Sequence, residues 1–322
     1  MVDIGLFYSY IYSKYTSTVF LQCYYLVVHT VHYNWRTKMY SELNILRDSK
    51  RFDVGNFIKK KSLEKQSGEN FTFGSVTIDC DLRKGLDDLT ISTVTYTEGN
   101  QVNVYLLDGY LPENNSKLDL IQTVSKLKPN HGYKIEIVIT NSELSLLQLL
   151  FKKLQTVEVD FISSWNLQFL VDKTTDTLDN LKKEPGELFD DNLYHKWSIK
   201  ERNPRDGARL LAPHQRWIEL AFDNRSLMLC SMQVYSQLRS HLTLDSYSIS
   251  NVLKKESVSS GDFTGYGKVD TKTGINWHIE MQEQYPLDYL AIHVVDAIDE
   301  SNLNKHTQDF SVNLPNLYLK ED

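Results

Sequence analysis

The sequence predicts an α/β protein, because β-branched runs and amphipathic helical segments alternate along the central part of the chain. Three short β-branched runs follow one another between residues 72 and 110, separated by polar, turn-like residues such as Glu98-Gly99-Asn100. A fourth run, residues 133–140, leads directly into a helical segment, and another strand follows it. This strand, helix, strand order favours a sheet with helices packed against it.

The first three runs predict a meander of antiparallel strands. They read FGSVTIDCD (residues 73–81), LTISTVTY (89–96) and VNVYLLDGY (102–110), and their spacing is typical of strands joined by short connections.

The segment after the fourth run predicts an amphipathic helix over residues 141–155. Ser142 is a helix-capping residue type, and the leucines and phenylalanine that follow it recur at helical spacing. Beyond it, we expect a strand at 159–166, a polar helix to residue 183 and a loop-rich stretch over 184–213.

The remainder of the chain predicts a hairpin and several helices. The hairpin joins 217–222 to 226–230 around Asp223-Asn224, and helices are expected at 232–242, 246–255 and 288–300. The last of these contains Asp296 on an apolar background, which indicates a buried carboxylate. The Ser- and Gly-rich residues 257–274 predict a mobile loop, and the Lys-rich residues 47–69 predict a helix plus a loop.

The composition excludes few functions, but it indicates the kind of cellular compartment. The 322 residues carry a formal net charge of −7, so the chain as a whole is not a typical nucleic-acid binder, although local basic patches occur at 59–65 and 196–216. Three cysteines without CxxC spacing argue against a disulfide scaffold and a structural zinc site, and fit a reducing compartment.

The amino-terminal residues 15–35 lack Lys, Arg, Asp and Glu over about the length that spans a bilayer. Polar residues interrupt them repeatedly, and a signal-peptide pattern is missing. We interpret them as buried strand-like sequence or as an extension peculiar to this chain. A cytoplasmic protein without a membrane partner is therefore expected.

Two aspartates at the end of the first strand are the candidate chemical centre. Asp79 and Asp81 stand two residues apart, so a strand directs both side chains to one face. Carboxylate oxygens are the ligands that Mg²⁺ and Mn²⁺ prefer, and Asp296 is a third acidic residue on an apolar run. From these residues alone, the solvated end of an ordinary strand remains the simpler interpretation.

Three segments in a fixed order favour a metal site over a solvated strand end. They are TIDCD at residues 77–81, SWNLQFL at 164–170 and IHVVD at 292–296. They resemble the three motifs of the 3′ to 5′ exonuclease domain of family B DNA polymerases, the phage-type enzymes in particular. Those motifs are a strand with Asp-x-Glu, an Asn followed by Phe-Asp, and a helix with Tyr-x-x-x-Asp. Residues 214–256, the piece around Met281-Gln282 and residues 307–315 also resemble the family, so the likeness covers about 73–315.

The resemblance implies a ribonuclease H-like fold, a mixed central β-sheet flanked by helices. It implies that Asp79, Asp81 and Asp296 are the catalytic residues and the ligands of Mg²⁺ or Mn²⁺. It also implies that nucleic acid is bound by the residues of the second motif, Trp165, Asn166 and Phe169.

Three positions depart from the family pattern. Leu170 stands where a metal-binding Asp is expected, and an isobutyl group cannot hold a cation, so the metal would be bound weakly or lost. Asp81 replaces a Glu and has a shorter reach, and Ile292 replaces the Tyr. Asp172 could substitute for the missing carboxylate only through a local bulge. His293 could be a replacement base, although a partly exposed helix residue is the commoner case.

These observations lead us to expect that the chain is the amino-terminal and exonuclease-domain portion of a phage-like family B DNA polymerase, and that its nuclease activity is impaired. Residues 1–70 would form an extension or small subdomain, and 71–322 the exonuclease domain. Its partners would be single-stranded DNA or a primer 3′ end and a separate polymerase chain, in the host cytoplasm if a phage encodes it. Two alternatives stay open: an active metal-dependent proofreading exonuclease, and a non-catalytic interaction module with this fold.

Overall fold

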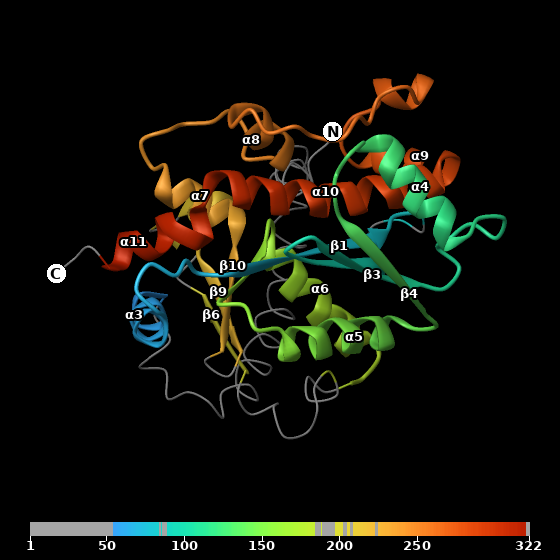
Figure 1. The fold of residues 1–322 in the computed structure, drawn as a ribbon. Helices are drawn as coiled ribbons and strands as arrows, with labels where there is room; N and C mark the ends of the chain where they lie inside the picture. Colours follow the sequence, from blue (N-terminus) through green and yellow to red (C-terminus); the bar gives the residue numbers. More distant parts are fainter. Residues whose placement is uncertain are drawn as a thin grey trace.

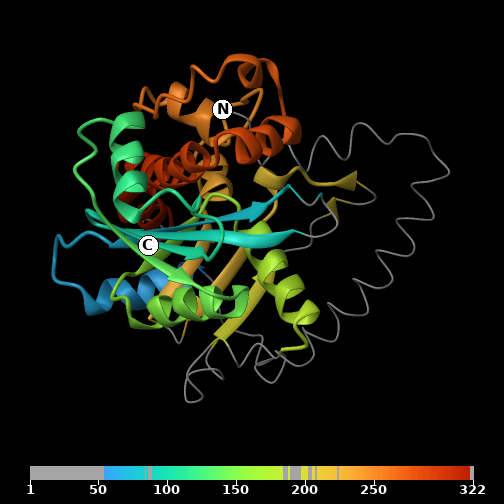
Figure 2. The ribbon, with the colours of Figure 1, turned by 90° about the vertical axis from the view of Figure 1, so that its right-hand side faces the viewer.

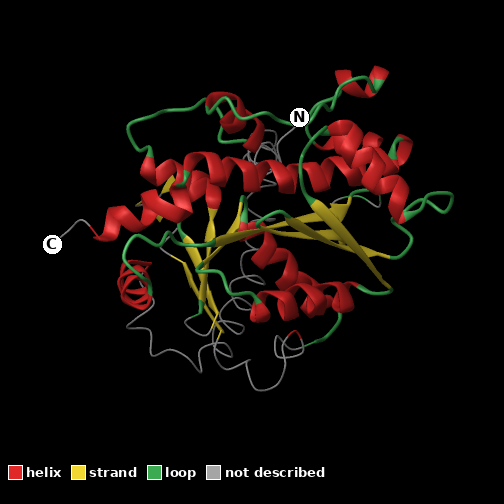
Figure 3. Ribbon diagram, in the orientation of Figure 1, coloured by secondary structure: helices red, strands yellow, loops and turns green. Residues whose placement is uncertain are grey.

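The protein consists of a mixed β-sheet with helices on both of its faces (Figures 1 and 3). The computed structural model describes residues 54–83, 85, 89–183, 188, 197–201, 205–206, 209–222 and 225–319. The larger sheet has eight strands in the order β4-β3-β2-β1-β5-β10-β9-β6, and β7 and β8 form a separate small ribbon. The predicted α/β class with a mixed sheet flanked by helices is therefore confirmed.

The strands are β1 (Phe73–Asp81), β2 (Thr90–Glu98), β3 (Gln101–Leu107), β4 (Lys134–Thr140), β5 (Phe161–Ser164), β6 (Trp197–Glu201), β7 (Arg205–Asp206), β8 (Arg209–Leu210), β9 (Ile218–Phe222) and β10 (Ser226–Cys230). The helices are α3 (Val54–Glu64), α4 (Lys117–Leu127), α5 (Glu143–Thr156), α6 (Leu167–Asn180), α7 (Ser231–Leu238), α8 (Ile249–Lys255), α9 (Ile275–Gln284), α10 (Pro286–Thr307) and α11 (Leu314–Leu319).

The pairing of the strands confirms the predicted meander and hairpin. β1 pairs antiparallel with β2, and β2 pairs antiparallel with β3. β9 and β10 are also antiparallel, while Asp223 and Asn224, where the turn was expected, lie outside the described ranges. The centre of the sheet is parallel, because β5 runs in the same direction as both β1 and β10.

Strand β1 is buried on both faces, and the two faces differ in chemistry. Val76, Ile78 and Cys80 belong to an apolar core that also contains α5 and α6. The alternate residues Thr77 and Asp79 face α10, where they contact His293 and Tyr289 respectively. Helix α10 crosses this face of the sheet over β1 and β2 (Figure 1). The end of β1 is therefore a buried position beneath a helix, and the expected solvated strand end does not occur.

Local capping explains where two of the helices begin. Ser142 caps α5 by accepting the backbone N–H of Ser145, as the sequence predicts. Helix α4 was missed, although Ser116 and Asp119 form a reciprocal capping box at its start. The loop-rich stretch was also predicted incompletely, because it contains β6, an edge strand of the sheet.

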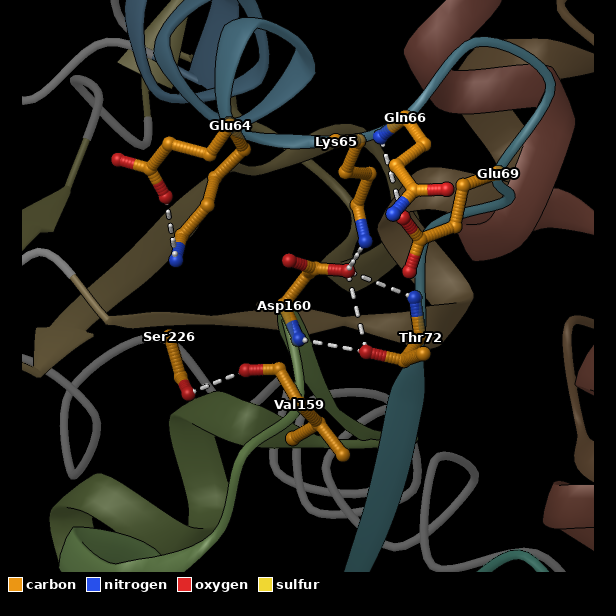
Figure 4. A network of polar contacts seen from close by, with 9 residues as sticks. Glu64, Lys65, Gln66, Glu69, Thr72, Val159, Asp160 and Ser226 are labelled. Carbon is orange, nitrogen blue, oxygen red and sulfur yellow. Dashed lines mark hydrogen bonds and ion pairs between the residues drawn. The ribbon is translucent and has the colours of Figure 1, made fainter.

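The segment before β1 is attached to the sheet by a small polar network around Asp160 (Figure 4). Asp160 Oδ2 accepts hydrogen bonds from the backbone N–H of Thr72 at 2.8 Å and from the Thr72 hydroxyl at 3.0 Å. The same oxygen forms an ion pair with Lys65 Nζ at 2.8 Å. Helix α3 lies beside α11, and Phe57 of α3 packs edge-on against Phe161 of β5. The carboxylate thus ties the start of β1 to the start of β5.

Residues 1–53 lie outside the described ranges, and so does the charge-free segment 15–35. Among the helices that the described ranges contain, none combines the length and apolar character needed to cross a bilayer.

Candidate functional site

The carboxyl ends of three parallel strands bring the first two sequence motifs to the same edge of the sheet. β1 ends at Asp81, β5 ends one residue before Trp165, and β10 ends at Cys230, whose Sγ donates to the Trp165 carbonyl. Figure 2 shows the sheet as a layer between the orange and red helices on one side and the yellow-green helices on the other. Only residues 73–75 of β1 pair with β5, so the rest of β1 extends beyond the end of β5. This edge is where open α/β sheets commonly bind ligands.

Asp79 is enclosed by helices α9 and α10. Its Oδ1 accepts the Tyr289 hydroxyl at 3.2 Å, while Oδ2 has no hydrogen-bond partner among the described residues. Burial raises the pKa of Asp79 to about 7, and the hydrogen bonds from the Cys80 backbone and Tyr289 only partly oppose that rise. The protonated form is therefore substantially populated at neutral pH.

Two residues of α9 complete the surroundings of Tyr289. His278 Nδ1 lies 2.9 Å from the Tyr289 hydroxyl oxygen. Gln282, one helical turn further on, accepts the Leu82 backbone N–H and donates to the Cys80 carbonyl, both at 2.8 Å. Gln282 thus bonds to the end of β1 as a neighbouring strand would. The sequence indicated Gln282 only through the resemblance of its segment to the polymerase family, and it did not indicate His278, because no spacing in the chain links α9 to a strand about 200 residues earlier.

Asp81 forms a two-point ion pair with Arg83. The guanidinium Nε lies 2.9 Å from Oδ1 and Nη2 lies 3.3 Å from Oδ2, and the Arg83 backbone N–H also donates to Oδ1 at 3.0 Å. Burial opposes ionisation of Asp81, but the hydrogen bonds from Arg83 and Tyr110 outweigh it and lower its pKa. Asp81 is therefore a carboxylate whose charge is balanced inside the protein.

Asp296 lies on α10, two helical turns beyond Tyr289, and is intermediate in exposure, so it is less buried than the sequence predicted. Its carboxylate is close enough to Tyr289 to disfavour ionisation of the phenol. Among the described residues, no three His, Cys, Asp or Glu side chains converge as a metal-binding group. The three-aspartate metal site stays a prediction.

His293 differs from its expected partly exposed position. It is buried, and its Nε2 lies 3.4 Å from the Thr77 hydroxyl. Desolvation lowers its pKa to about 4, with a smaller contribution from His278, so the imidazole is neutral at pH 7. The expected Tyr at position 292 has a partial counterpart, since Tyr289 lies three residues earlier and supplies a hydroxyl to Asp79.

The second motif forms the start of α6. Asn166 caps this helix by accepting the Phe169 backbone N–H at 3.3 Å, and Trp165 Nε1 donates to the Tyr247 carbonyl at 3.2 Å. Leu170 is 1% exposed and packs in the apolar core. Asp172 bonds to Gln168 at 2.9 Å on the same helix. Because two helical residues differ by about 200° in direction, Asp172 does not occupy the place of Leu170.

A scan against models of known protein families finds no match, and a search of curated proteins finds no significant similarity. The resemblance to the polymerase exonucleases therefore depends on the three motifs and the sequence segments between them.

Proposed function

We propose that this chain is an exonuclease-type domain with a ribonuclease H-like fold, belonging to a phage-like family B DNA polymerase. In this proposal it binds single-stranded DNA or a primer 3′ end, and its metal-dependent nuclease activity is impaired.

The single observation that carries the proposal is the state of the two aspartates at the end of β1. Both oxygens of Asp81 are bonded to Arg83, and Asp79 is buried and hydrogen-bonded to Tyr289. A two-metal site needs several ionised carboxylates with lone pairs directed at the ions. Here one carboxylate is balanced by an internal cation, and burial raises the pKa of the other to about 7, so that it is partly protonated at neutral pH.

The position of the motifs supports the binding part of the proposal. Asp79 and Asp81 at the end of β1 share the carboxyl edge of the sheet with Trp165 and Asn166, which follow β5. Tyr247 lies beside Trp165, and its ring stacks on His214 with centroids 3.9 Å apart. Partly exposed aromatic rings beside a polar edge are suited to stacking on unpaired bases.

A nuclease assay separates the impaired domain from an active exonuclease. A labelled 3′-ended oligonucleotide is incubated with the protein in Mg²⁺, in Mn²⁺ and in EDTA, and its binding is measured in parallel at several salt concentrations. We expect salt-dependent binding without digestion. Mn²⁺-dependent hydrolysis that disappears in Asp79→Ala would contradict the proposal and establish the active enzyme. Absence of binding at low salt would favour the interaction module.

A further inference from the structure

The ion pair at the end of β1 presents its positive half to solvent. The side chain of Arg83 is 38% exposed, whereas that of Asp81 is only 2% exposed. An approaching molecule therefore meets the guanidinium, and the carboxylate lies beneath it. An anion is attracted to this arrangement and a cation is not, because the carboxylate oxygens are occupied and covered.

The guanidinium is also held in one orientation. Asp81 binds it through Nε and Nη2, and its Cζ lies 5.0 Å from the centroid of the Tyr110 ring. The Leu82 backbone that leads to Arg83 is fixed by Gln282 of α9. A guanidinium placed in this way loses little conformational entropy when a ligand binds.

Donor groups remain for a ligand. A guanidinium carries five N–H groups in a planar fork; two of them donate to Asp81, and the Tyr110 hydroxyl also accepts a hydrogen bond from the guanidinium. The remaining N–H groups suit a phosphate oxygen, which arginine commonly binds by two parallel hydrogen bonds. Because Asp81 balances the charge, the attraction is short-ranged and depends on direct contact.

We propose that Arg83 is a phosphate-binding residue of this site, and that it contacts the backbone of single-stranded DNA at the end of β1. The inference rests on the proposed function, since it assigns a residue to the binding of the same ligand. It differs from the metal-based expectation, because the cation that meets the phosphate is part of the chain.

The test compares Arg83→Gln with the wild-type protein in binding to fluorescein-labelled oligo(dT) by anisotropy, in EDTA and over a range of salt. Lys152→Gln is the matched control, because it removes one positive charge from an exposed position on α5. Loss of one phosphate contact should reduce the slope of log K against log salt by about 0.7 and weaken binding roughly tenfold at low salt. Lys152→Gln should change neither quantity.

Arg83→Lys provides a second measurement, since it keeps the charge but cannot form the two-point contact. We expect the wild-type slope with reduced affinity, and circular dichroism verifies that each variant is folded. Equal binding of wild type and Arg83→Gln would overturn the inference while leaving the proposed function in place. Binding that requires Mg²⁺ would overturn it as well, and failure of the wild type to bind would remove both.

Discussion

Glu300 offers the sharpest test of the buried polar layer beneath α10. It is 0% exposed, and its Oε1 accepts the Ser231 hydroxyl at 2.7 Å and the Ser163 hydroxyl at 3.2 Å. The Trp165 backbone also donates to the carboxylate, whereas Oε2 has no hydrogen-bond partner among the described residues. All these donors are neutral, so an ionised Glu300 would lack a counter-charge among them.

Burial raises the pKa of Glu300 to about 7, from an ordinary value of 4.5, and its hydrogen bonds only partly oppose that rise. The folded protein therefore binds this proton more tightly than the unfolded chain does. The contribution of Glu300 to the free energy of unfolding is therefore largest below pH 4.5. It falls as the pH rises from 4.5 to about 7, and above pH 7 it no longer changes. At about 1.4 kcal/mol per pH unit, the loss is about 3 kcal/mol.

The assay is urea unfolding of the wild type and of Glu300→Gln between pH 4 and pH 9. The variant cannot ionise at this position, so it should be about 3 kcal/mol more stable than the wild type at pH 9 and similar at pH 4. Glu283→Gln on α9 removes an exposed carboxylate and should match the wild type throughout. A difference between Glu300→Gln and wild type that is the same at every pH would refute the reasoning.

Two further variants test other contacts of the fold by thermal or urea unfolding. Lys128→Met leaves the fully buried Asp299 without its ion-pair partner and should cost about 3–5 kcal/mol at pH 7, whereas the exposed Lys126→Met in the last turn of α4 should be neutral. If the double variant Lys128→Met, Asp299→Leu recovers none of the loss, the buried charge is not its cause. Gly74→Ala places a methyl 2.5 Å from the Tyr96 hydroxyl and should cost about 1–3 kcal/mol. Adding Tyr96→Phe should restore part of that loss, and no recovery would show that the clash lies elsewhere.

The elements that sequence predicts well are those whose evidence is local. Strand β1, the meander after it and helix α5 follow from β-branched runs, apolar spacing and the Ser142 cap. Helix α4 was predictable too, because its capping box is visible in the sequence at Ser116 and Asp119. The weaker strand β6 was not, since it becomes a strand only by pairing with β9.

The two aspartates of the candidate site were predictable from the sequence, but their hydrogen-bond partners and their protonation were not. Asp79 and Asp81 are evident as a pair on one strand, but the contact between Asp79 and Tyr289 joins residues 210 positions apart. No periodicity in the chain predicts such a contact, because it depends on how α10 crosses the sheet. The pairing of Asp81 with Arg83 spans only two residues, and the hydrogen bond from the Arg83 backbone N–H that accompanies it requires the chain to turn after the strand.

The two faces of β1 explain why its aspartates differ from those of an exposed strand end. One face is apolar and packs against α5 and α6. The other carries Thr77 and Asp79 beneath α10, so it is polar and buried, a combination that stabilises a fold only when the polar groups find partners. Asp79 finds a neutral hydroxyl and remains protonated in part, whereas Asp81 reaches Arg83 and ionises. The same strand thus holds one carboxyl that is partly protonated at neutral pH and one that is ionised and holds the Arg83 side chain in place.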